Sequence, residues 1–308
     1  MQKFTNRRKN KRNKMDNKGQ LSSSTIRMFN VPNLLTAANL LGGFFSIIAT
    51  LSGRLDLACL ALLLSAIFDF FDGMAARVLQ QHSPLGKQLD SLADMVSFGI
   101  APGMLMFVMI ILGVDQTGLK IQENGLRLFQ GDIDTYPEIQ ILAWVRAFFY
   151  NEPNYFDATI KWLPFTAMII PFFAMFRLAK FNIDERQTDK FIGVPTPLAT
   201  IFFIFFPLYF YTELPNWGYK SDYVRQIFDC YSLVGIVVLF SILMVANVPL
   251  IALKFKNLTW KDNKFRYTLI GLSLLSIVIF RLWSIPIIVT LYLLLSIIEN
   301  SQIKKNEI

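Results

Sequence analysis

The sequence predicts an all-α protein, a polytopic bundle of helices that crosses a membrane several times. Three observations lead to this fold class. Hydrophobic residues make up 54% of the 308 residues and charged residues only 17%, whereas soluble domains carry about 25% charged residues. The apolar residues gather in long runs without the polar face of a soluble helix, which argues against a soluble helical protein. Basic residues gather in alternate connections between the runs, which is typical of the cytoplasmic side of a multi-pass membrane protein.

Eight apolar runs satisfy or approach the length of about 20 residues that a membrane-spanning helix needs. They cover residues 33–51, 55–79, 90–112, 160–179, 195–212, 230–251, 267–282 and 284–299. The last two runs are short and closely joined, so we expect them to form a tilted helical hairpin within a C-terminal segment, 253–308. No function is assigned from the sequence to this hairpin or to the long connection 113–159.

The first 28 residues predict a basic, disordered tail. Eight lysine and arginine residues fall within the first eighteen positions, interleaved with asparagine. A nucleic-acid-binding arm would share this composition, but beside a membrane span the commoner function is a cytoplasmic signal that touches anionic lipid headgroups. We therefore expect membrane lipids and no nucleic acid as partners.

The distribution of charge over the other connections predicts the orientation. Further basic residues follow the second, fourth, sixth and eighth runs, whereas the connection 113–159 is rich in aspartate and glutamate. Because basic residues collect on the cytoplasmic side, both termini are expected in the cytoplasm and 113–159 in the periplasm of a bacterial inner membrane.

Four aspartates lie around the junction of the second and third runs. Asp69 and Asp72 are spaced i, i+3, and Asp90 and Asp94 are spaced i, i+4, so each pair projects from one face of a helix. Each costs about 2.5–3.5 kcal/mol near the centre of a membrane helix, and the two basic residues nearby offset only part of the negative charge. A structural ion network is one explanation. A site for divalent Mg²⁺ or Mn²⁺, which prefer oxygen ligands and hold substrate phosphates, is the interpretation we favour.

The residues around the aspartates complete a longer motif. It reads Asp69-x-x-Asp72-Gly73-x-x-Ala76-Arg77, eight further residues, then Gly86-x-x-x-Asp90-x-x-x-Asp94. The motif matches the signature of the CDP-alcohol phosphatidyltransferase family without a departure, and the chain resembles this family from Pro32 to the sixth run. The resemblance implies a six-helix membrane core over residues 29–252, a homodimer, and two Mg²⁺ or Mn²⁺ ions that hold the pyrophosphate of a CDP-linked lipid.

The resemblance also implies roles for individual residues. Asp69, Asp72, Asp90 and Asp94 would be metal ligands, and Asp94 would in addition act as the general base that takes the proton of the attacking hydroxyl. The residues expected to line the pocket for the cytidine nucleotide are Asp69, Gly73, Ala76, Arg77 and Gly86.

Three other segments are similar to the branch of the family whose acceptor is serine. They are residues 89–102, 177–182 and 191–197. The resemblance implies that CDP-diacylglycerol and L-serine are the substrates. A serine carboxylate suits the planar fork of an arginine, so Arg177 is expected to bind it, unless this residue is only a snorkelling anchor. Asn182 and Ser97 are further candidates for serine binding, although Ser97 could equally be a packing residue.

Two other functions stay open at this point. The first is the same reaction with another acceptor, such as glycerol 3-phosphate, which would need additional basic residues facing the cavity. The second is a divalent-cation transporter, which would place acids near the middle of the membrane on several helices. The four aspartates of this chain instead lie at one junction of two runs, which favours the enzyme.

Overall fold

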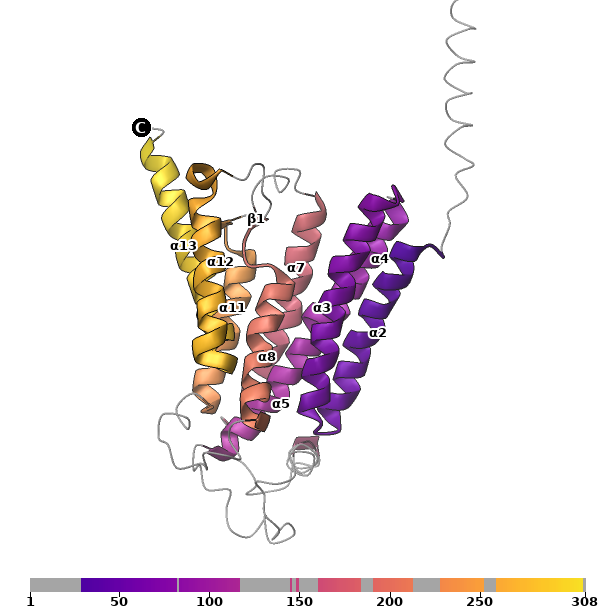
Figure 1. Cartoon of the computed structure of the whole chain (residues 1–308). Helices are drawn as coiled ribbons and strands as arrows, with labels where there is room; N and C mark the ends of the chain where they lie inside the picture. The colour runs from indigo at the N-terminus through magenta and orange to yellow at the C-terminus, as the bar shows by residue number, and fades with distance from the viewer. Residues whose placement is uncertain are drawn as a thin grey trace, which may run out of the picture.

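The computed structural model describes residues 29–81, 83–116, 145, 148–149, 160–183, 191–212, 228–251 and 259–306. These residues form a bundle of long helices that run up and down beside one another (Figure 1). The predicted basic tail, 1–28, lies outside the described residues, as does most of the connection 113–159. In Figure 1 the start of the first helix and the end of the last lie at the same end of the bundle.

The first two helices, α2 (Val31–Leu51) and α3 (Leu55–Val78), form a closely packed antiparallel pair. Helix α2 begins where the side chain of Asn30 accepts a hydrogen bond from the backbone N–H of Asn33, at 2.8 Å, which satisfies one of the free donors of the first turn. Close packing depends on glycine in α2, because a Cβ at Gly42 would collide with the Ser65 hydroxyl of α3.

The third segment is one continuous helical stretch in three parts: α4 (Pro84–Asp94), the π-helical η1 (Met95–Ile100) and α5 (Ala101–Gln116). It begins at Pro84 rather than at the predicted residue 90. The Ser83 hydroxyl caps it by accepting a hydrogen bond from the Gly86 N–H at 2.9 Å. The polar first turns of α4 do not form part of the apolar run, so the run by itself locates the start of this helix too late.

The middle of the bundle is formed by four further elements and a short strand pairing. After the 3₁₀ segment η4 (Ile160–Met168) come α7 (Ile169–Ile183), α8 (Thr196–Thr212) and α11 (Cys230–Val245). The strands β1 (Phe191–Ile192) and β2 (Pro249–Leu250) pair antiparallel. The sequence does not predict this pairing, because each strand has only two residues and they are far apart in the chain.

The chain ends in two antiparallel helices that pack against each other. They are α12 (Trp260–Phe280) and α13 (Ser284–Asn306), joined by the 3₁₀ turn η6 (Arg281–Trp283). The reversal takes place at Arg281, whose φ of 47° is unusual for a residue other than glycine. Helix α13 also packs against α8 and β2, so this pair of helices is docked on the rest of the bundle.

The surface of the helices is that of a membrane protein. Large apolar side chains point outward from α2, α3 and α12, as shown by exposed fractions of 56% for Phe44, 66% for Phe70 and 79% for Val278. Such surface is stable only against lipid or a partner. Among the described residues, five helical stretches are long and apolar enough to cross a membrane, and the last of them, 263–302, covers most of α12 and most of α13. The chain is thus a helical membrane protein, and the count of eight spans stays a prediction.

Candidate metal and substrate site

Three carboxylates come together between the last turns of α3 and the second half of α4. Oxygens of Asp69 and Asp72 on α3 and of Asp90 on α4 all lie within 4.8 Å of one another. Asp72 is buried and the other two are half-buried. The i, i+3 spacing in α3 points both of its carboxylates at the partner helix, as the sequence predicts.

Basic side chains do not neutralise this cluster within the described part of the chain. Arg77 donates its Nε–H to the Gly73 carbonyl at 3.0 Å, and the Lys87 ammonium donates to the Asn182 carbonyl at 2.9 Å. The ion pair found among the described residues joins Arg54 and Asp56 at the other end of α3. A structural ion network therefore does not explain the cluster, whereas three adjacent hard oxygen donors fit a divalent cation such as Mg²⁺ or Mn²⁺.

Helix α2 supports the carboxylates with two polar side chains. The Thr36 hydroxyl donates to Asp72 Oδ2 at 2.7 Å, and the Asn39 amide donates to Asp94 Oδ1 at 3.2 Å. Both α2 residues are buried, Asn39 completely. The sequence motif does not include either residue. Their spacing of i, i+3 within an apolar run is a signal that could have found them, because buried polar residues in membrane helices are costly without a partner.

Asp94 lies beside the group of three rather than within it. It is the last residue of α4, one turn beyond Asp90, and its carboxylate faces Asn39 and also lies near Asp69. The π-helical turn begins at the next residue, and such turns occur frequently at functional sites. This arrangement leaves Asp94 next to any ligand that the other three aspartates bind.

Ser97 lies inside the π-helical turn and is completely buried. Its hydroxyl donates to the carbonyls of Asn39 and Ala93, both at 3.0 Å. A Cβ on Gly43 of α2 would come within 2.7 Å of the Ser97 backbone, so the two segments touch closely. These contacts favour the packing role for Ser97 over serine binding.

The four small or basic residues expected at the nucleotide pocket have different surroundings. A Cβ on Gly73 would meet only the Arg77 guanidinium, at 3.7 Å, so there is open space beside this turn of α3. Ala76 is half-buried and Arg77 is exposed. At Gly86, a Cβ would lie 3.2 Å from the Asn33 side chain, which means that glycine here lets the first turn of α4 approach α2.

Arg177 of α7 is buried, with 7% of its surface exposed. Its Nε–H donates to the Val194 carbonyl at 2.7 Å, and its guanidinium lies 5.9 Å from the centre of the Phe181 ring. It is also near enough to Asp94 for their charges to interact. A snorkelling anchor keeps its charged head in water, whereas the Arg177 guanidinium is buried and bonded to Val194.

Asn182, five residues beyond Arg177, connects α7 to α4. Its side-chain N–H donates to the Ser91 hydroxyl at 2.7 Å, and its backbone carbonyl accepts the bond from Lys87. The helix that carries Arg177 is thereby held against the helix that carries Asp90 and Asp94. Residues separated by about ninety positions in the sequence thus meet at one site.

The fold and the acidic cluster define the class of the protein as a helical membrane protein with a carboxylate site at one end of its bundle. Residues 29–117, which include all four aspartates, match the family described as CDP-alcohol phosphatidyltransferase. The chain belongs to the CDP-alcohol phosphatidyltransferase family, and the resemblance inferred from the motif is confirmed. It is an enzyme of phosphatidyl transfer.

Curated relatives extend the similarity beyond the matched segment. The chain is 27% identical over 271 residues to CDP-diacylglycerol–serine O-phosphatidyltransferase of Helicobacter pylori (strain J99). The aligned residues cover 87% of this chain and 90% of the relative. It is 30% identical over 169 residues to the protein of the same name from Bacillus subtilis (strain 168), covering 55% of this chain and 70% of the relative. It is 40% identical over 80 residues to archaetidylserine synthase of Methanothermobacter thermautotrophicus, and these residues cover 25% of this chain and 34% of the relative.

Proposed function

We propose that the protein transfers the phosphatidyl group from CDP-diacylglycerol to the hydroxyl of L-serine, giving phosphatidylserine and CMP. The observation that carries the proposal is the group of three carboxylates within 4.8 Å, with the Asp94 carboxylate beside it and a buried arginine nearby. The names of the relatives support serine as the acceptor. The direct test is to incubate the purified protein with CDP-diacylglycerol and labelled serine and to identify the lipid formed.

Asp69, Asp72 and Asp90 are the residues that would hold the divalent cations, two ions of Mg²⁺ or Mn²⁺, with Asp94 as a further ligand. When bound, such ions neutralise the charge of the pyrophosphate and of the departing CMP. Thr36 fixes one oxygen of Asp72 through its hydrogen bond, which leaves the other oxygen for a ligand. Gly73 leaves open space beside the cluster, and the nucleotide would lie there, against Ala76, Arg77 and Gly86.

Asp94 is the proposed general base. A serine hydroxyl is a poor nucleophile near neutral pH, so a carboxylate within hydrogen-bonding reach accepts its proton as the new bond forms. The serine oxygen bonds to the phosphorus that carries the diacylglycerol, the bond from that phosphorus to CMP breaks, and the proton passes to Asp94. Asn39 holds one carboxylate oxygen of Asp94 and so orients the other.

Arg177 is the proposed site for the serine carboxylate. Among the described residues, Val194 is the hydrogen-bond partner of its guanidinium, and this bond uses Nε. The two terminal nitrogens therefore form the edge that can bind a carboxylate through two parallel hydrogen bonds. Asn182 offers its side-chain oxygen to the serine ammonium, since its N–H is already donated to Ser91.

Replacing Arg177 by lysine should raise the serine KM roughly ten- to a hundredfold, because lysine keeps the charge but loses the fork, and one hydrogen bond to a charged group contributes about 1.5–3 kcal/mol. The turnover number should change much less. The measurement is a kinetic series in both substrates, with glycerol 3-phosphate and inositol phosphate as competing acceptors. The matched control is Lys180→Arg, a basic exchange on the same helix at a half-buried side chain that bonds to Asn247.

The competing acceptors distinguish an error in the proposed acceptor from an error in the role proposed for Arg177. If the wild-type protein prefers glycerol 3-phosphate or inositol phosphate, serine is not its acceptor, although the carboxylate chemistry would stand. If Arg177→Lys leaves the serine KM unchanged while the wild-type protein uses serine, then Arg177 does not bind the carboxylate.

We also propose that the protein lies in a bacterial inner membrane with both termini and the active site facing the cytoplasm, and that it forms a homodimer. Single cysteines test the orientation, because the native Cys59 and Cys230 are buried and give little background. Glu123→Cys, in the acidic connection, should react with an impermeant thiol reagent in intact cells. Trp260→Cys, exposed at the start of α12, should react only after the membrane is opened. The reverse pattern would contradict the proposed orientation.

A further inference from the structure

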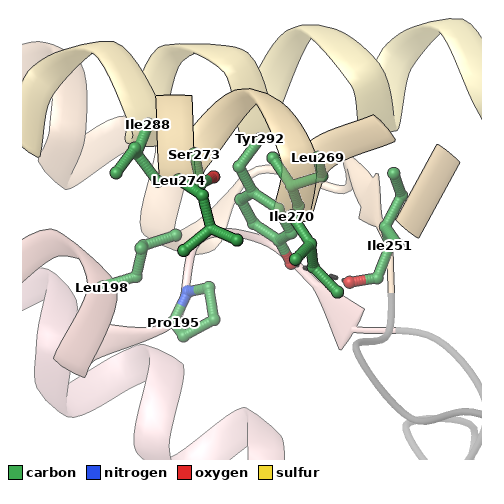
Figure 2. Close-up of a pocket in the computed structure, with 9 residues that line it drawn as sticks. All are labelled: Pro195, Leu198, Ile251, Leu269, Ile270, Ser273, Leu274, Ile288 and Tyr292. Atoms are coloured by element: carbon green, nitrogen blue, oxygen red, sulfur yellow. Dashed lines mark hydrogen bonds between the residues drawn. The ribbon is translucent and has the colours of Figure 1, made fainter. Parts of the chain in front are cut away.

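Helix α13 carries three polar side chains at i, i+4 and i+8 that contact the backbone around β2. The Tyr292 hydroxyl donates to the Ile251 carbonyl at 2.9 Å, a bond drawn in Figure 2. The Ile251 N–H donates to the Ser296 hydroxyl at 3.1 Å, and the Asn300 amide donates to the Pro249 carbonyl at 2.6 Å. We call these three residues the α13 ladder. They hold both backbone groups of Ile251 and one of Pro249.

The strand held by the α13 ladder continues into the segment that binds Arg177. Strand β2 pairs with β1, and the residue after β1, Gly193, donates its N–H to the Val248 carbonyl at 2.9 Å. Gly193 has a φ of 78°, and a Cβ there would lie 2.4 Å from the Met244 carbonyl, so the turn requires glycine. The next residue is Val194, whose N–H donates to the Leu243 carbonyl at 3.0 Å and whose own carbonyl accepts the Arg177 bond.

Packing and hydrogen bonds both hold β2, since Leu250 and Ile251 are almost completely buried in the core. Tyr292 borders an apolar cavity of about 380 Å³ that lies between α8, α12 and α13 and is also lined by Leu198 and Leu274 (Figure 2). The side chains around this cavity are almost all apolar, so the backbone groups of Ile251 depend on Tyr292 and Ser296 for their hydrogen bonds. The hydrogen bonds of Tyr292 and Ser296 therefore add to what keeps the β2 segment in place, because a buried backbone group without a partner is costly.

We propose that Tyr292, Ser296 and Asn300 are positioning residues for the acceptor subsite. They hold β2, β2 holds the β1–Val194 segment, and the Val194 carbonyl orients the guanidinium of Arg177 so that its terminal nitrogens face the serine carboxylate. This inference rests on the proposed function, in which Arg177 binds that carboxylate. It gives the C-terminal helices, which lie beyond the segment matched to the family, a part in the choice of acceptor.

The test is the pair of mild substitutions Tyr292→Phe and Ser296→Ala, each alone and each combined with Arg177→Lys. Each single variant should raise the serine KM about three- to tenfold, the effect of one weakened hydrogen bond. The KM for CDP-diacylglycerol and the turnover number should stay within about twofold of wild type. Because the ladder acts through Arg177, adding either substitution to Arg177→Lys should raise the serine KM by much less than it does alone.

The matched control is Ser301→Ala, on the same helix. Ser301 is exposed, and among the described residues its hydroxyl bonds to the Ile297 carbonyl of its own helix, so its removal should leave both KM values unchanged. Thermal unfolding of every purified variant shows whether the fold is kept, and the ladder variants should unfold within a few degrees of wild type.

The outcomes separate this inference from the proposed function. If Arg177→Lys raises the serine KM but Tyr292→Phe and Ser296→Ala do not, the ladder has no positioning role and the proposed function stands. If the ladder variants lower turnover and weaken both substrates equally, or add fully to Arg177→Lys, their role is general stability and the inference is wrong. If the wild-type protein does not use serine, the proposed function fails, and the inference falls with it.

Discussion

Replacing Asp72 or Asp90 by asparagine should remove nearly all phosphatidyl transfer. The two residues come from different helices, and with Asp69 their oxygens lie within 4.8 Å of one another. A neutral amide is a poor ligand for a hard divalent cation, so the metals would be lost or misplaced. The loss should exceed the roughly 10- to 100-fold that follows when a residue merely supporting a ligand is removed.

The supporting residue is available for comparison in the same chain. Thr36→Val removes the hydroxyl that donates to Asp72 but keeps the carboxylate, so its loss should fall in that range of roughly 10- to 100-fold. Asp56→Asn is the matched control, because Asp56 is on α3 as well but pairs with Arg54 at the surface, and such pairs contribute little. It should keep near wild-type activity.

Metal binding can be measured without turnover. Mn²⁺ should raise the unfolding temperature of the wild-type protein and of Asp56→Asn, since a ligand that binds only the folded state stabilises it. It should not do so for Asp72→Asn or Asp90→Asn. Full turnover of the wild-type protein in EDTA, or a normal Mn²⁺ response in both variants, would sink the metal-site proposal.

Replacing Asp94 by asparagine should slow transfer by about 10²–10⁴-fold, the usual contribution of a general base. Unlike the ligand variants, Asp94→Asn should keep much of its affinity for CDP-diacylglycerol, because Asp69, Asp72 and Asp90 still form their cluster. The position of Asp94 outside that cluster, facing Asn39, is the reason for expecting this difference.

The measurement for Asp94→Asn is a two-substrate kinetic series together with a direct binding assay for CDP-diacylglycerol. A general base predicts a low turnover number with nearly normal lipid binding and a normal Mn²⁺ response. If lipid binding is lost to the same degree as in Asp72→Asn, Asp94 acts chiefly as a metal ligand. If turnover is unchanged, Asp94 is not the group that accepts the proton of the serine hydroxyl.

The sequence predicted the acidic site because every signal for it is local. The two pairs of aspartates have helical spacing, and the connection between their helices is short, so few arrangements could keep the pairs apart. The helical membrane class was equally accessible, since it depends on composition. What α2 contributes was not predicted. Thr36 and Asn39 could be recognised as costly residues, but their partners on α3 and α4 depend on how three helices pack.

The acceptor side could be predicted only in part. Arg177 was chosen from its residue type and its place in a family motif, but the sequence did not show what fixes its direction. That depends on the Val194 carbonyl and on the β1–β2 pairing, which joins residues far apart in the chain. Two-residue strands have no alternation long enough to detect, so the contact between this segment and α13 was visible only in the structure.

The π-helical turn at Met95–Ile100 sets the rotational phase between two parts of one helix. Its hydrogen bonds close over one more residue than those of an α-helix, which shifts the face of everything after it by about 100° relative to an uninterrupted α-helix. Before the turn, Asp90 and Asp94 face α2 and α3; after it, α5 is buried in the centre of the bundle. The π-helical turn lets one continuous helix direct the carboxylates of α4 toward α2 and α3 and the apolar face of α5 toward the core. Deleting one residue within this turn would therefore rotate α4 relative to α5. Either the carboxylates would turn away from α2 and α3, or the buried face of α5 would turn away from the core, although every residue of the site would be kept.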